Sequence, residues 1–272
     1  MSRLRCSVAL SLFGRSLKPA LKRASVSGAS GVTVDTRHGV TPSEFSASAI
    51  RHLRKFLDEL GLELAVATFP TRRGLADRRD LEARVEAIKG ALAFARTLGV
   101  NRVTLHTGPV PRDEEDEAGH NGRELLLEVL CDLARHGNQV GSLPVLELGA
   151  TGPETVRDLF GQVDTGPLGL DLCPATWTGR GHDPVSVFRE LYDVVNHVRV
   201  GDAIRHSDGS YDRVPVGHGE VAWDEMLAVL SEAEYSGWLT AGTSGGDDPA
   251  RDATRAISLL TSYWPGGADS LA

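Results

Sequence analysis

Three residues near the ends of short apolar segments have side chains that could move a proton next to a carbonyl group. Glu147 lies in the apolar run 143–148, where a carboxylate is costly to bury unless a cation, a metal or several donors stabilise it. His106 precedes a Thr-Gly-Pro turn, and Arg199 lies in the run 197–201. A carboxylate can act as a base, while imidazole or guanidinium can polarise a carbonyl or stabilise an enediolate. We therefore predict Glu147, His106 and Arg199 as catalytic residues, with a structural histidine and a structural ion pair as the alternatives.

Five further residues could bind a substrate: Trp177, His197, Arg72, Asp202 and His218. Trp177 could stack on the C–H face of a sugar, and loop packing is the alternative. His197 lies two residues before the catalytic arginine and so on the same strand face, where a packed core histidine is the alternative. Arg72 could bind a phosphate or carboxylate, or lie in solvent. Asp202 could orient a loop or a basic partner, and His218 lies in a glycine-rich turn near the expected site.

The order of strand-like and helix-like segments predicts how these residues are positioned. Short β-rich apolar runs alternate with longer segments whose apolar residues recur every three or four positions, which is typical of parallel strands covered by helices. We predict eight strands, at residues 7–13, 31–35, 62–68, 102–106, 144–148, 168–172, 197–201 and 238–242. We predict helices at residues 42–60, 81–98, 123–135, 153–160, 184–192, 223–234 and 249–262. This order indicates an α/β protein with a single (β/α)8 TIM barrel over residues 1–272, whose chemistry lies at the carboxyl ends of the strands.

Composition and charge disfavour several classes of protein. The 272 residues carry a formal net charge of −8, which disfavours nucleic-acid binding because contacts to phosphate need a basic surface. No apolar run is long enough to span a bilayer, and the apolar stretch near the start is better interpreted as a first strand. The three cysteines are widely spaced, so we predict reduced thiols and a cytoplasmic protein. A small-molecule partner fits this chain better than a nucleic acid or a membrane.

Several motifs resemble one known family across nearly the whole chain. In the first half they are FPTRRG at 69–74, LEARV at 81–85, ARTLGV at 95–100 and VTLHTG at 103–108. In the second half HVRVGD at 197–202, VPVGHGEVAW at 214–223 and YSGWLT at 235–240 are similar to the HxHxKD, VPxGxGxxxW and YxGWLT stretches of the xylose-isomerase-like TIM-barrel superfamily. That superfamily includes sugar isomerases and epimerases, inosose dehydratases and a branch of abasic-site endonucleases. The resemblance implies a barrel that acts on a small carbohydrate or polyol.

The resemblance also implies a divalent metal, Mn²⁺ or Mg²⁺, at the strand ends. Glu147 stands at the strand-five ligand position. Where the family has an Asp and a His after strand six, this chain has Cys173 and Thr176. Arg199 stands in place of the second histidine of strand seven, and Gly242 in place of the glutamate of strand eight. Asp171 could replace Cys173 as a ligand, but it would lie about 6 to 7 Å deeper along the strand. Because hard cations need several oxygen ligands, we predict no metal cofactor, with the charge of Arg199 pairing with Glu147 directly or across a ligand.

Two functional hypotheses follow. In the first, the protein is an isomerase or epimerase in which Glu147 transfers a proton and His106, His197 or Arg199 polarises the substrate. In the second, it is a non-catalytic barrel that binds a sugar-like ligand or a protein partner, since a fold does not fix a function. An abasic-site nuclease is a distant third, because it would need a multi-metal cluster and a basic surface. The sequence leaves the oligomeric state open, a homo-oligomer included.

Overall fold

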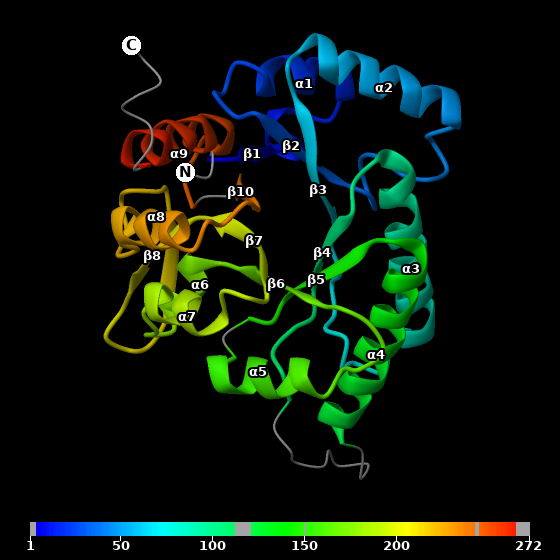
Figure 1. Ribbon diagram of the computed structural model, residues 1–272. Coiled ribbons are helices and arrows are strands. Elements are labelled where there is room, and N and C mark those ends of the chain that lie inside the picture. Colours follow the sequence, from blue (N-terminus) through cyan, green and yellow to red (C-terminus); the bar gives the residue numbers. More distant parts are fainter. Residues whose placement is uncertain (1–3, 112–120, 150, 243–244, 265–272) are drawn as a thin grey trace. The chain divides into compact units, whose positions relative to one another are not determined.

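Eight parallel strands form a closed barrel in the part of the chain that the computed structural model describes, residues 4–111, 121–149, 151–242 and 245–264 (Figure 1). Around the barrel the strands follow the order β1, β10, β7, β6, β5, β4, β3 and β2. Their bounds are β1 Cys6–Ala9, β2 Gly31–Asp35, β3 Glu63–Phe69, β4 Arg102–His106, β5 Leu143–Glu147, β6 Gly169–Leu172, β7 Val195–Val200 and β10 Trp238–Ala241. The prediction of an α/β protein with a (β/α)8 barrel is confirmed, and the strand ends are where such a barrel carries its chemistry.

Helices connect the strands, and the apolar periodicity predicts those described here except the ones at Leu17–Ala24 and Pro174–Gly179. The helices are α1 Leu17–Ala24, α2 Ala47–Glu59, α3 Leu81–Leu98, α4 Gly122–Val140, α5 Pro153–Gly161, α6 Pro174–Gly179, α7 Pro184–Leu191, α8 Trp223–Glu232 and α9 Pro249–Tyr263. The helix α3 ends at Gly99, whose left-handed φ of 89° suits a residue without a side chain and lets its N–H reach the carbonyls of the last turn. None of the helices that the structure describes combines the length and apolar character required to cross a membrane.

The region before β2 differs from the prediction. The strand β1 ends at Ala9, and Leu10–Phe13 form a short 3₁₀ helix, η1, where the sequence predicts a continuous strand. Helix α1 is missing from the prediction because its basic residues obscure an apolar stripe, although Ala20, Leu21 and Ala24 are buried. Helix α2 begins later than the predicted residue 42, because the carbonyl of Thr41 accepts from the N–H groups of Glu44 and Phe45 in a separate turn.

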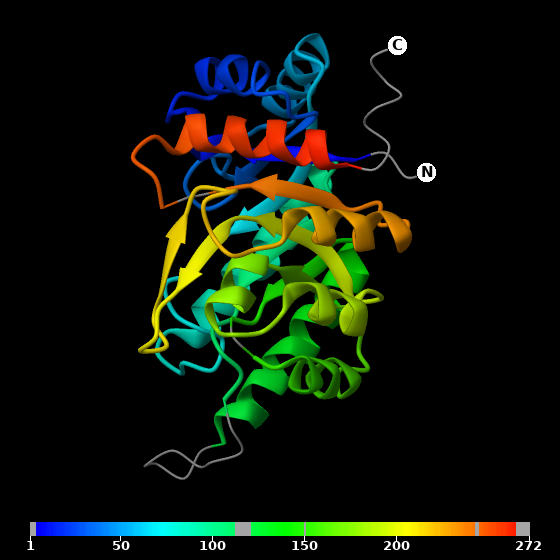
Figure 2. The same ribbon diagram turned by 90° about the vertical axis from the view of Figure 1, so that its left-hand side faces the viewer.

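An unpredicted hairpin follows β7. Strands β8 Asp202–Arg205 and β9 Tyr211–Val214 pair in antiparallel fashion, with Asp202 opposite Val214 (Figure 2 shows them as adjacent yellow arrows). The turn contains Gly209 at a φ of 84°, and the N–H of His206 donates to the carbonyl of Ser210. An Asp-Gly pair between two short strands is a strong hairpin signal, so the sequence did contain this element.

The chain divides into two compact units. Unit 1 comprises the described residues of Met1–Val34, Ala47–Ala65 and Leu172–Ala272, and unit 2 those of Asp35–Ser46 and Val66–Asp171. Within unit 1, β10 lies between β1 and β7, with Leu239 opposite Cys6 on one side and Val198 on the other. Within unit 2, β4 and β5 pair in parallel along their whole length, up to His106 opposite Glu147. A single domain over residues 1–272 stays a prediction.

Candidate functional site

Within unit 2, the carboxyl ends of β4 and β5 bring His106 and Glu147 together. The two residues are partners in the strand register, and His106 Nδ1 lies 3.4 Å from Glu147 Oε2. The imidazole is 46% exposed and the carboxylate 13% exposed, so the pair faces out from an apolar strand end. A partly buried carboxylate beside an accessible imidazole is an arrangement that can accept, hold and return a proton. Both residues were predicted as catalytic from the sequence.

The backbone around this pair is held rigidly. The carbonyl of Glu147 accepts from the N–H of Thr107 at 3.1 Å and from its hydroxyl at 2.8 Å. The carbonyl of His106 accepts from the hydroxyl of Thr71 at 2.8 Å, which ties the loop after β3 to the end of β4. The loop after β3 lies so close to the backbone after β4 that position 74 requires glycine, because a Cβ there would lie 2.7 Å from the carbonyl oxygen of Thr107.

Within unit 1, one guanidinium occupies the end of β6. Arg213, on β9, donates from Nη2 to the hydroxyl of Thr176 at 2.8 Å and from Nη1 to the sulfur of Cys173 at 3.6 Å. Cys173 and Thr176 are the residues that stand at the strand-six ligand positions by resemblance. A fixed positive charge is therefore bound to both of them, and it would repel a divalent cation placed there. Arg213 was not among the residues predicted from the sequence.

The residues at the strand ends do not fit a hard divalent metal. Among the described residues, no group of three or more His, Cys, Asp and Glu side chains is arranged to hold a metal ion. Cys173 is a soft ligand already in contact with Arg213, and Gly242 has no side chain, whereas Mn²⁺ and Mg²⁺ need several oxygen ligands. A Cβ built on Gly242 would meet no described residue within 4 Å. Asp171 is buried at 2% exposure, consistent with a position deeper in the barrel.

His197 lies in a buried polar layer of unit 1, which favours the packed core histidine, and its role in substrate binding stays a prediction. It is 3% exposed, and its Nε2 lies 2.6 Å from the hydroxyl of Thr240. That hydroxyl in turn lies 2.6 Å from the hydroxyl of Ser7. Arg199 lies opposite Thr240 in the register of β7 and β10, and strand alternation gives it the same face as His197. Its predicted pairing with Glu147 joins residues of different units and stays a prediction.

Asp202 orients a loop. It is 1% exposed, and its carboxylate accepts hydrogen bonds of 2.9 to 3.1 Å from four backbone N–H groups, those of Ala203, Gly217, Gly219 and Val221. These four hydrogen bonds support the alternative in which Asp202 orients a loop, and its role in substrate binding stays a prediction. His218 is exposed in the turn that Asp202 holds.

Trp177 packs inside unit 1. It is 2% exposed, and its ring meets the edge of His182 at a centroid distance of 5.4 Å. A sugar platform needs an open ring face, so this burial favours the loop-packing alternative, and substrate binding by Trp177 stays a prediction. Arg72 is exposed in unit 2, where it lines a cavity with other arginines.

The sequence matches the model of one protein family over residues 21–263, and the description of that family is xylose isomerase-like TIM barrel. The match covers most of the chain, so the protein belongs to this family. Among curated proteins, none gives a significant match to the sequence.

Solved structures share the fold over almost the whole chain. A xylose isomerase domain protein from Planctomyces limnophilus matches with a TM-score of 0.79 at 23% identity, over 96% of each chain. A D-tagatose 3-epimerase-like protein matches with a TM-score of 0.78 at 18% identity, over 99% of this chain and 100% of that one. A xylose isomerase-like TIM barrel protein from Mycobacterium smegmatis, in complex with magnesium, matches with a TM-score of 0.71 at 18% identity, over 96% and 97%. At such identities the similarity is one of fold.

Proposed function

We propose that this protein is an isomerase or epimerase of a small carbohydrate or polyol, with Glu147 as the base that takes a proton from the carbon next to a carbonyl. The observation that carries the proposal is the pairing of His106 and Glu147 at the carboxyl ends of neighbouring strands, 3.4 Å apart. Family membership favours the same class of reaction, since its structural relatives include a D-tagatose 3-epimerase-like protein and a D-psicose 3-epimerase. We place the protein in the cytoplasm, in keeping with its three free thiols.

The chemistry needs one base and a means of stabilising negative charge. When Glu147 takes the proton, the C–H electrons move to the carbonyl oxygen and form an enediolate. In an isomerase, Glu147 then returns the proton to the neighbouring carbon while the proton of the adjacent hydroxyl moves to the former carbonyl oxygen; in an epimerase, a second acid on the opposite face donates a proton to the original carbon. His106 is accessible enough to donate a hydrogen bond to that oxygen, and as an imidazolium it would also stabilise the carboxylate before substrate binds. The donor set at the strand ends favours a reaction without Mn²⁺ or Mg²⁺, so protein cations take the place of a metal.

A second candidate function is binding without catalysis. The contact of Arg213 with Cys173 and Thr176 favours it, because the position that would hold a metal in an active relative holds a guanidinium here. In that case the barrel binds a sugar-like ligand or a protein partner, and the pair in unit 2 contributes to binding alone.

Hydrogen exchange distinguishes the two functions. The protein would be incubated in D₂O with D-tagatose, D-psicose and D-fructose, and deuterium at the carbons beside the carbonyl would be followed by NMR, with EDTA and with added Mn²⁺. We expect exchange that EDTA does not reduce, and a loss of roughly 100- to 10,000-fold in Glu147→Gln. Glu154→Gln, which removes an exposed carboxylate in the first turn of α5, is the matched control and should retain activity.

Two results would contradict the proposal. Exchange that requires added Mn²⁺ would show that the donor set binds a metal after all. Calorimetric binding of these sugars with no exchange under either condition would favour the non-catalytic barrel, and Glu147→Gln would then change sugar affinity alone.

A further inference from the structure

A cavity in unit 2 concentrates positive charge in an otherwise acidic protein. It has a volume of about 850 Å³ and lies between the loop after β2, the end of β3 and one face of α3. Four of its lining residues are arginines, Arg37, Arg72, Arg73 and Arg84, and one is a carboxylate, Asp80. The chain as a whole has a net charge of −8, so this lining is opposite in sign to the average surface.

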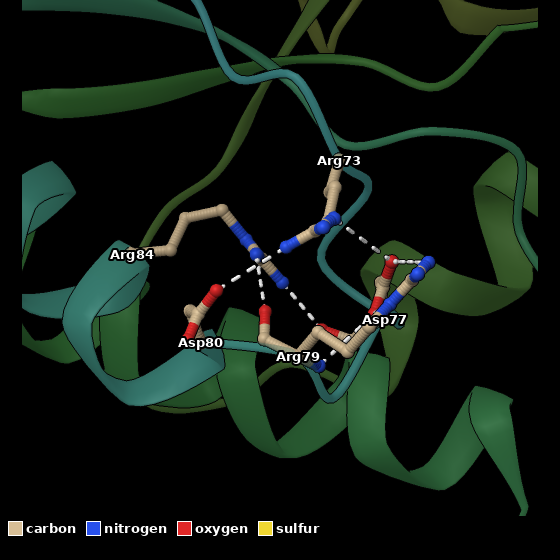
Figure 3. Close-up of polar contacts among 5 residues, drawn as sticks. All are labelled: Arg73, Asp77, Arg79, Asp80 and Arg84. Carbon is tan, nitrogen blue, oxygen red and sulfur yellow. Dashed lines mark hydrogen bonds and ion pairs between the residues drawn. The ribbon is translucent and has the colours of Figure 1, made fainter.

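The guanidinium of Arg84 forms its hydrogen bonds with neutral backbone carbonyl groups. Its guanidinium donates to the carbonyl of Arg79 at 2.9 Å and to the carbonyl of Asp77, while its Nε is buried without a hydrogen-bond partner among the described residues. Figure 3 shows the side chains of Arg84 and Arg73 directed toward one another, from α3 and from the loop before it. Burial is the main cause that lowers the pKa of Arg84, and the charge of Arg73 adds to it, while the charges of Asp77 and Asp80 oppose this shift in part. Carbonyl oxygens fix this guanidinium in place but leave its full charge to be balanced.

The two nearby carboxylates are engaged elsewhere. Asp77 is bound by Arg79 at 2.8 Å, and this hydrogen bond is the main reason that the pKa of Asp77 falls to about 2. Asp80 pairs with Arg73 at 3.2 Å. Arg37, like Arg84, donates to a neutral partner, the carbonyl of Pro70 at 2.8 Å. The lining therefore has more guanidinium groups than carboxylates to pair with them.

The rest of the cavity lining suits an organic molecule larger than an inorganic ion. It supplies hydroxyl groups and small or apolar surfaces, contributed by Thr36, Thr41, Ser43, Phe69, Ala83, Ala87 and Ala91. The guanidinium fork matches carboxylate and phosphate groups, with two parallel hydrogen bonds to each. A volume of about 850 Å³ is within the usual range for cavities that hold metabolite-sized ligands.

We propose that this cavity is a binding site for a small organic anion that carries a phosphate or carboxylate group, with Arg37, Arg72 and Arg84 as its recognition residues. The site does not depend on the proposed function, because neither His106 nor Glu147 lines it. It lies one loop away from them, since Thr71, next to Arg72, donates to the carbonyl of His106.

Isothermal titration calorimetry at low ionic strength tests this site, with inorganic phosphate and citrate as probes. We expect saturable binding of one anion per chain, weakened at least about 10-fold in Arg72→Gln and in Arg84→Met. Arg78→Gln removes the same charge from an exposed position of the same loop that does not line the cavity, and it should bind as the unaltered protein does. Arg72 is exposed, so its replacement keeps the test valid if Arg84→Met unfolds.

The absence of saturable binding of both probes to the unaltered protein would overturn the proposal. An equal loss of affinity in Arg78→Gln and Arg72→Gln would also overturn it, since that result would mean a general response to net charge. The outcome is separate from the exchange experiment, because binding of phosphate or citrate is measured without any sugar.

Discussion

Asp80 is placed so that its charge opposes an anion in the arginine-lined cavity. It precedes α3 with a φ of 51°, in the left-handed region, and its side chain does not cap the helix. The carboxylate instead pairs with Arg73 and is 84% exposed. An exposed pair of this kind contributes little to stability, so its main effect is on the local charge.

Asp80→Asn should therefore tighten the binding of phosphate by about 2- to 5-fold, a range that follows from the small energies of exposed charge pairs. Asparagine tolerates the left-handed backbone, so the start of α3 should be preserved. Calorimetry with inorganic phosphate measures the change. Glu82→Gln removes an exposed carboxylate from the first turn of α3 outside this cavity, and a similar gain there would contradict the argument.

At the scale of single residues, the sequence placed side chains at strand ends better than it predicted contacts across loops. His106 and Glu147 could be placed together because parallel strands bring their carboxyl ends to one rim. Arg213 could not, because it contacts Cys173 and Thr176 across 40 and 37 positions of sequence. Trp177 and His197 were predicted at plausible places, but burial depends on packing that the local pattern does not contain.

Among the elements, the loop after β9 depends on one buried carboxylate. Four backbone N–H groups converge on Asp202, and a Cβ at Gly219 would lie 2.3 Å from its Oδ1. The loop between β9 and α8 is therefore folded around an anion that belongs to the chain itself. This arrangement explains why the sequence there is rich in glycine.

Asp202→Asn should destabilise the protein by about 3 kcal/mol, because the amide group would turn donors toward N–H groups that need an acceptor. Urea unfolding measures the loss, and limited proteolysis should cut within residues 215–221. Asp212→Asn, on the same hairpin, removes an exposed carboxylate that contacts His206 and should cost less than about 0.5 kcal/mol. Equal losses in the two variants would contradict a special role for Asp202.

The helices and strands could be predicted where the spacing of apolar residues in the sequence matches the residues that are buried in the fold. The predicted segments 31–35 and 102–106 coincide with β2 and β4, because buried parallel strands form short apolar runs between polar turns. Helix α1 and the hairpin β8–β9 were missed for different reasons. The first is short and strongly basic, and the second consists of two four-residue strands whose polar and partly exposed residues form no apolar run.

At the scale of the whole molecule, burial decides the reactivity of the three thiols. Cys6 and Cys173 are 5% and 2% exposed, while Cys131 on α4 is partly exposed. Burial raises the pKa of Cys6 to about 12, so that thiol stays protonated at neutral and mildly alkaline pH. Because the thiolate is the reactive form, the folded protein protects two of its cysteines.

We therefore expect one thiol per chain to react with Ellman's reagent at pH 8 in the folded protein, and three after denaturation in guanidinium chloride. The absorbance of the released thiolate gives the count. In Cys131→Ser, the folded protein should show no fast phase in its reaction with Ellman's reagent. A fast phase that persists in this variant would mean that Cys6 or Cys173 is more accessible than its burial indicates.

The end of β10 also makes this barrel suitable for design. Among the described residues, nothing lies within 4 Å of a Cβ built on Gly242, so a side chain can begin there without a clash at its first carbon. Glutamate at this position, combined with replacements that remove the guanidinium and restore oxygen and imidazole ligands, would give an engineer a stepwise route toward a metalloenzyme. The chain is thus a starting point for asking how few substitutions would give a barrel of this kind a set of metal ligands.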